Sequence, residues 1–214
     1  MMYDMEGNTI APMEKGAAHE RMREEYEQGS PTVKDHHIHL VLMNPAGQLL
    51  VYKRGQTEED NRGLIDKLGT HLPYKKDKES STFENHSSLA LATASEVIKR
   101  LSKEVIIADY SDLARILEQQ RGSINTDTAV IWPEAVYQEM HSIRVVSDGR
   151  WVNPNITTRV FGYLPDRLPE GNYSFVAPET IFSGVNRPRV FTDDLREIVR
   201  TEAKLVSLDE RIKR

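Results

Sequence analysis

Four histidines lie in two short segments of the chain, and metal binding is the chemistry that their type and spacing can support. They are His36, His37, His39 and His71. In an extended strand His37 and His39 point to the same side, because successive side chains alternate between the two faces. Their imidazoles could then approach a point that His71 also reaches, and imidazole is a common metal ligand. The simpler interpretation, which we favour from sequence alone, places these histidines at the solvent edge of a strand.

A basic pair, Lys53 and Arg54, offers a second chemistry, the binding of phosphate oxygens. The pair ends a predicted strand, and a guanidinium can hold two oxygens of one anion through parallel hydrogen bonds. Exposed cations at a strand end are the alternative interpretation. The sequence leaves the two open.

The elements that position these residues follow from periodicity. Residues 39–43 alternate as a strand, residues 44–47 fit a type I turn, and residues 48–54 return, so the pattern predicts a β-hairpin. Residues 63–71 are interpreted as a turn, and apolar residues at near-helical spacing predict a helix over 88–105. Further helices are expected at 17–28, at 111–120 and from 192, and further strands at 128–132, 142–146, 150–152 and 157–164.

Composition restricts the class of protein. The 214 residues suit one α/β domain over 35–202, with an exposed insertion near 74–87, an N-terminal extension over 1–34 and a tail over 203–214. A net charge of −5 argues against general nucleic-acid binding. No apolar run reaches the roughly 20 residues that span a membrane. The absence of cysteine excludes disulfides and thiolate chemistry. We therefore expect a cytoplasmic protein.

The order of these segments resembles the Nudix superfamily. Many members have an apolar strand, an Asn-x-x-Gly turn, a strand ending in a basic pair, and Gly-x-Trp-Asp before Gly-Gly-His. The matching segments here are 44–47, 53–54, 63–66 and 69–71, with Ile65 in place of tryptophan and Thr70 in place of a glycine. Segments 176–179 and 191–195 also look like the end of a Nudix domain.

The resemblance covers roughly residues 17–200. It implies an α/β/α sandwich with a mixed sheet, an N-terminal helical extension and a C-terminal helix. It also implies that the ligand is bound by Lys53, Arg54, Gly69, Thr70 and His71.

Nudix proteins usually cleave diphosphate-linked metabolites with magnesium or manganese held by glutamates of a helical box. In one register Glu96 survives, while Lys99 and Arg100 stand where paired glutamates belong. A shifted register keeps only Glu104. The resemblance therefore gives Glu96 and Glu104 as the candidate catalytic and metal-binding residues. Nearby cations disfavour a divalent ion, and the alternative is an ordinary solvated helix face on which Glu96 supports Arg100.

These departures favour a Nudix-like protein that binds a small phosphorylated metabolite or nucleotide, with weak or absent hydrolysis. Its cofactor would be magnesium or manganese, or none, and a homodimer stays open. One alternative is an active pyrophosphohydrolase with ligands among Glu84, Glu96, Glu104 and Glu139; another is a structural or protein-interaction domain. A more distant likeness to isopentenyl diphosphate isomerase, which binds a metal through histidines, rests on residues 69–71. That isomerase needs a cysteine, which is missing here, so its reaction is not expected.

Overall fold

The computed structural model describes residues 2–6, 8, 10, 13–58, 60–72, 83–102, 104–146, 149–167, 171–183, 190–201 and 205–213, with side chains at all of these except 83–87, 134–143, 145–146, 183 and 201. Its strands are β1 (Met2–Asp4), β2 (Val33–Met43), β3 (Leu49–Lys53), β4 (Ile65–His71), β5 (Glu104–Ile107), β6 (Thr128–Val146), β7 (Gly149–Tyr163) and β8 (Tyr173–Val176). Its helices are α1 (Lys15–Glu27), α2 (Phe83–Ile98), α3 (Leu113–Ile124), α4 (Pro178–Ser183), α5 (Asp193–Thr201) and α6 (Leu208–Lys213), and the 3₁₀ turn η2 (Tyr110–Asp112) precedes α3.

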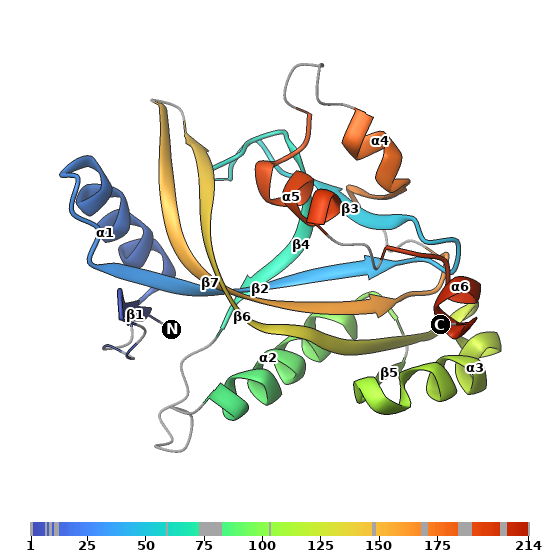
Figure 1. The fold of residues 1–214 in the computed structure, drawn as a ribbon. Coiled ribbons are helices and arrows are strands. Elements are labelled where there is room, and N and C mark those ends of the chain that lie inside the picture. Colours follow the sequence, from blue (N-terminus) through green and yellow to red (C-terminus); the bar gives the residue numbers. More distant parts are fainter. Residues whose placement is uncertain are drawn as a thin grey trace.

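The eight described strands form one mixed sheet (Figure 1). Its order is β5-β6-β7-β2-β4-β3-β8, and β1 pairs with β2 outside that path. The pairs β2–β7 and β5–β6 are parallel, and the other pairs are antiparallel. The antiparallel pair Val146↔Gly149 joins β6 to β7, so the strands expected over 142–146 and 150–152 are paired with each other.

Helices cover both faces of this sheet, which confirms the mixed α/β sandwich expected from the sequence. One face packs against α2 through apolar residues that include Ile38, Leu40 and Leu42 of β2. The opposite face packs against α3, α4, α5 and α6 through residues that include Val41 and Met43. Figure 1 shows α2 below β2 and β7, with α4 and α5 above the sheet.

Strand β2 is buried along its whole length and divides the two faces by the period of two that a strand imposes. Its even-numbered positions Ile38, Leu40 and Leu42 belong to the apolar layer that packs against α2. On its other face, Val33 packs with α1 at one end and Val41 and Met43 enter the second core at the other. The intervening positions 35, 37 and 39 are polar, so the sheet has a polar window between two apolar clusters.

The N-terminal extension closes one side of that window. Ala18 and Met22 of α1 pack with Met2 of β1, Val33 of β2 and Trp151 of β7 in a separate apolar cluster. Figure 1 shows α1 beside the ribbon formed by β6 and β7. The helix predicted over 17–28 is α1, which begins two residues earlier than expected and ends at Glu27.

The expected hairpin of β2 and β3 was confirmed: the two strands are antiparallel with Met43↔Leu49 as their registered pair, and β3 also pairs with β4 and β8. Two other local predictions were wrong. Residues 65–71 form the strand β4 rather than a turn. The helix expected over 88–105 begins at Phe83 and ends at Ile98, so Glu104 lies in strand β5 and the shifted box register does not fall on a helix.

Other local predictions were confirmed. The helix expected from residue 192 is α5, which begins at Asp193, and the backbone N–H of Leu195 donates to Thr192 Oγ1, so Thr192 caps this helix. Most of the insertion predicted near 74–87 lies outside the described residues. Within the part of the chain that the structure describes, no helix combines the length and apolar character needed to cross a membrane.

Candidate functional site

The polar window of β2 forms the floor of a cavity of about 600 Å³. Residues from α1, β2, β3, β4, the segment after β3 and β6 line it. Its histidines are His19, His37, His39 and His71; its basic residues are Lys15, Arg54, Lys67 and Arg144; its acidic residues are Glu58, Asp60 and Asp66. Tyr52, Thr57, Gly69 and Thr70 complete the lining.

At one end of the cavity three imidazoles converge on the buried carboxylate of Asp35. The Nε2 atoms of His37, His71 and His19 lie 2.8, 3.1 and 3.4 Å from Asp35 Oδ2. His19 Nε2 and His71 Nε2 lie 3.2 Å apart. Tetrahedral coordination by ligands near 2.0–2.1 Å places the ligand atoms roughly 3.4 Å from one another. The four side chains therefore have nearly the mutual spacing that one bound transition-metal ion requires, and their ligand atoms all lie within 4.8 Å of one another.

The protonation states of this His–Asp cluster (His19, Asp35, His37 and His71) also suit a metal. Burial alone would raise the pKa of Asp35, but the charge of His37 and hydrogen bonds from the three histidines outweigh it and hold the pKa well below its usual range. Burial lowers the pKa of His37 to about 4, against the opposing effect of Asp35. Burial likewise lowers the pKa of His71. At neutral pH the carboxylate is therefore ionised and these two imidazoles are neutral, which is the form that binds metals.

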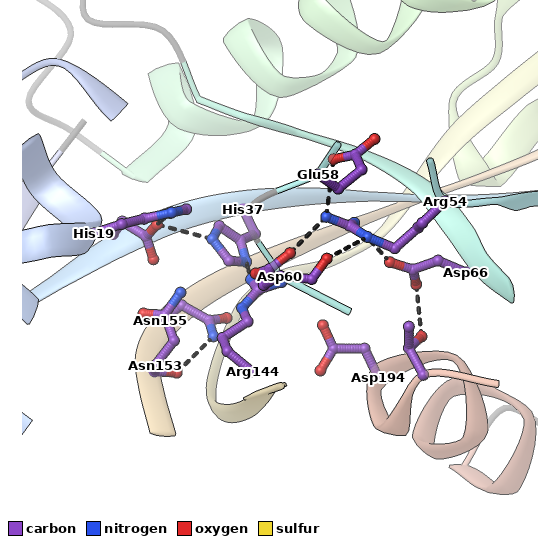
Figure 2. Close-up of polar contacts among 12 residues, drawn as sticks. His19, His37, Arg54, Glu58, Asp60, Asp66, Arg144, Asn153, Asn155 and Asp194 are labelled. Atoms are coloured by element: carbon purple, nitrogen blue, oxygen red, sulfur yellow. Dashed lines mark hydrogen bonds and ion pairs between the residues drawn. The ribbon is translucent and has the colours of Figure 1, made fainter. Parts of the chain in front are cut away.

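The middle of the cavity is organised around Arg54 (Figure 2). Its Nη1 donates to Asp66 Oδ2 at 3.2 Å and to the Tyr52 hydroxyl at 3.1 Å. Its Nη2 donates to Glu58 Oε2 at 3.1 Å and to Asp60 Oδ1 at 2.5 Å. Burial raises the pKa of Tyr52 to about 12, so its hydroxyl stays protonated and accepts from Arg54. The guanidinium is thus held rigidly by four side chains.

Asp60 connects Arg54 to a second arginine. Its Oδ2 lies 3.4 Å from Nη1 of Arg144, which comes from β6. Arg144 Nη2 in turn lies 3.4 Å from His37 Nδ1, so it can donate to that imidazole. Figure 2 shows Asp60 between the two guanidinium groups. A chain of polar contacts therefore runs from Arg54 through Asp60 and Arg144 to the His–Asp cluster.

A buried ion pair anchors the other end of the cavity. Lys67 Nζ of β4 lies 3.2 Å from Asp194 Oδ2 in the first turn of α5. Thr192 donates to Asp66 Oδ1 at 2.7 Å, which ties the start of α5 to β4. His39 lies beneath this pair with Nε2 3.9 Å from Asp194 Oδ2, and burial holds its pKa well below the usual range.

The structure brings together most of the residues that the sequence suggested for ligand binding. Arg54, Gly69, Thr70 and His71 all line the cavity. Lys53 does not, because strand alternation turns its side chain away to the exposed surface. The alternative in which His37, His39 and His71 approach one point is confirmed in part. His37 and His71 lie together with His19 and Asp35, whereas His39 lies next to Asp194.

The two box glutamates lie away from this cavity. Glu96 is on α2, its side chain is 71% exposed, and Lys99 Nζ lies 2.6 Å from its Oε1. Glu104 begins β5 and is exposed. Among the described residues, neither belongs to a group of three or more metal-ligating side chains. They do not fit a shared magnesium or manganese site, and their catalytic role stays an untested prediction. The side chains of Glu84 and Glu139 lie outside the described ones.

Sequence reasoning missed His19, Asp35, Asp60 and Arg144. Asp35 had a usable signal, because it precedes His37 by two positions and so shares its strand face. His19 lies in a correctly predicted helix, but nothing in that helix indicates which partner it meets. Asp60 and Arg144 are 84 positions apart in the sequence and meet only in the tertiary fold.

Two solved structures are similar to this chain at low sequence identity. No family model matches the chain, and no curated protein is similar to it. The crystal structure of DR0079 from Deinococcus radiodurans is similar with a TM-score of 0.48 and 11% identity, covering 94% of this chain and 98% of that one. A MutT protein from Methanosarcina mazei Go1 is similar with a TM-score of 0.40 and 12% identity, covering 85% of this chain and 96% of that one. Values this low do not establish a shared activity.

Proposed function

We propose that this chain is a Nudix-like protein that binds a small phosphorylated metabolite beside a divalent metal ion held by His19, Asp35, His37 and His71. The observation that carries the proposal is the convergence of three Nε2 atoms on one buried carboxylate oxygen at the wall of a polar cavity. A cavity of about 600 Å³ is within the range of small-ligand sites.

The donor set favours zinc or a similar transition metal. Three imidazoles and one carboxylate suit zinc, whereas magnesium prefers oxygen ligands alone. The sequence expectation of magnesium or manganese rested on Glu96 and Glu104, whose positions do not supply a common site. Manganese accepts both donor types, so it is the second metal to test.

Charge explains why an anionic ligand would accompany the metal. Around the cavity, Lys15, Arg54, Lys67 and Arg144 are balanced by Asp35, Glu58, Asp60 and Asp66. Arg159 and Asp194, whose charges both interact with His39, add one further charge of each sign. A divalent ion turns this balanced site into a positive one, and a phosphate group carries the complementary charge.

Nudix-type hydrolysis is weak or absent in this proposal. The box helix supplies Glu96, which is already paired with Lys99, and it packs on the sheet face opposite to the cavity. The ligand is therefore expected to bind without rapid cleavage of its phosphate groups.

Isothermal titration calorimetry tests the proposal. Zinc, manganese and magnesium are titrated into metal-free protein, and pyrophosphate and adenosine diphosphate into the metal-loaded form, with released phosphate measured in parallel. Zinc is expected to bind once per chain, and His19→Ala and His71→Ala should each weaken it at least about tenfold. Glu96→Gln serves as the matched control and should change nothing. Equal zinc affinity in all variants, or no binding of either phosphate compound, would overturn the proposal.

A further inference from the structure

Asp60 makes contacts of the kind that a bound phosphate would make. Its carboxylate oxygens are shared between two arginines, with Oδ1 2.5 Å from Arg54 Nη2 and Oδ2 3.4 Å from Arg144 Nη1. Carboxylate and phosphate oxygens accept the same charge-assisted hydrogen bonds from guanidinium groups. The side chain of Asp60 is 10% exposed, so this arrangement lies inside the cavity and not on the surface.

Each arginine also contacts a side chain other than Asp60. Arg54 is fixed through Nη1 by Asp66 and Tyr52, which belong to β4 and β3. Arg144 is buried, with only 7% of the residue exposed. Within the described residues its Nε has no hydrogen-bond partner. A buried guanidinium with an unused N–H is costly, and a ligand that accepts from it would remove that cost.

We propose that Arg54 and Arg144 form the subsite for a phosphate group, and that the Asp60 carboxylate holds this subsite until the ligand displaces it. This inference rests on the proposed function, because it assigns the position of the phosphate within the same cavity. Asp60 therefore acts as an internal competitor, and its removal should tighten binding rather than weaken it.

The subsite also indicates which phosphate compounds fit. His37 lies between the two regions: its Nε2 is 2.8 Å from Asp35 Oδ2 in the His–Asp cluster, and its Nδ1 is 3.4 Å from Arg144 Nη2. One imidazole thus separates the metal-binding atoms from the arginines. A diphosphate can place one phosphoryl group against the arginines and the other toward the metal. Diphosphates are therefore expected to bind more tightly than monophosphates.

Removal of Asp60 is the decisive experiment. Zinc-loaded protein, freed of excess zinc, is titrated with pyrophosphate and with inorganic phosphate by calorimetry. Asp60→Asn should raise the affinity for pyrophosphate by about tenfold or more, and Arg144→Gln should lower it by a similar factor. Asp112→Asn removes the same charge from an exposed ion pair with Arg115 outside the cavity, and it should change the affinity by less than about twofold.

The outcomes separate the two proposals. Unchanged or weaker pyrophosphate binding by Asp60→Asn, with wild-type binding intact, overturns the subsite and leaves the proposed function standing. Absence of binding by both proteins overturns the proposed function itself. Should the Asp60 variant fail to fold, hydrogen exchange in wild-type protein gives the answer: pyrophosphate should accelerate exchange of the Asn61 to Gly63 amides, and unchanged or slower exchange refutes displacement of Asp60.

Discussion

Replacement of Asp194 by asparagine should strongly destabilise the protein, because it leaves Lys67 charged and buried. The two groups lie 3.2 Å apart, and each side chain is only 8% exposed. Breaking a buried ion pair by removing one partner costs about 3–5 kcal/mol, mostly the penalty of the charge that remains. For a chain of this length each kcal/mol lowers the melting temperature by about 2–4 °C, so Asp194→Asn should melt roughly 6–20 °C below wild type.

The pH dependence gives this prediction a sign. Burial alone would raise the pKa of Asp194, but Lys67, Arg144 and His39 outweigh it and hold the pKa far below the usual range. A carboxylate with a depressed pKa in the folded state contributes its full stability above its unfolded pKa of about 3.9 and loses it as the pH falls further. Below that pH, wild type should lose about 1.4 kcal/mol per pH unit relative to the variant. The stability gap should therefore narrow in acid.

Urea unfolding at pH 7, 5, 4 and 3 measures this gap. Asp112→Asn is the control, since Asp112 pairs with Arg115 at 3.2 Å with both side chains more than half exposed. An exposed pair contributes about 0–1 kcal/mol, so Asp112→Asn should cost no more than that at pH 7. A loss below 1 kcal/mol for Asp194→Asn, or a gap that stays constant down to pH 3, would refute the role assigned to the Lys67–Asp194 pair.

Three further substitutions test other parts of the structure. Arg54→Gln should lower the free energy of unfolding in urea by about 3 kcal/mol or more, because it removes the cation paired with the buried carboxylate of Asp66. A near-neutral effect would mean that this network does not stabilise the fold. Gly162→Ala should cost about 1–3 kcal/mol, since an added Cβ would lie 2.8 Å from Ile131 Cγ2; an unchanged melting temperature would contradict the packing of β7 on β6. Thr192→Val should cost about 1–2 kcal/mol through loss of the α5 cap and of the hydrogen bond to Asp66; equal hydrogen-exchange protection of residues 193–196 in both proteins would refute it.

Elements with a strong local signal were predictable from the sequence. The helix α1 and the start of α5 follow from helix-forming and capping residues, and Thr192 caps α5 through its Oγ1. The alternation along β2 also predicted that His37 and His39 share a face. The favoured interpretation, a position at the solvent edge, was wrong because both histidines are buried, and the alternative in which His71 approaches them fits better. The side chains of His37 and His71 meet with ring centroids 4.6 Å apart. Local periodicity was sufficient in these cases because each contact involves one strand and its immediate partner.

Strand pairing was not predictable from the same signals. The Asn44 to Gly47 turn forms, and the backbone N–H of Gly47 donates to Asn44 O, yet the strands that it joins diverge after Met43↔Leu49. Over most of its length strand β2 pairs with β4 and, in parallel, with β7, whose residues lie more than 100 positions later. A turn sequence fixes the direction of the chain, but burial of both faces decides which strands become neighbours.

Burial also explains why the candidate site lies on the sheet face away from α2. The inward positions of α2 include Ala90, Ala94 and Ile98, which are fully buried against apolar residues of the sheet. A divalent ion needs polar ligands and partial access to water, and an apolar interface of this kind offers neither. The opposite face of β2 has three consecutive inward positions without an apolar side chain, and α1 brings His19 over them. The polar middle of one face of β2 therefore holds the His–Asp cluster, whereas the face that packs against α2 is apolar.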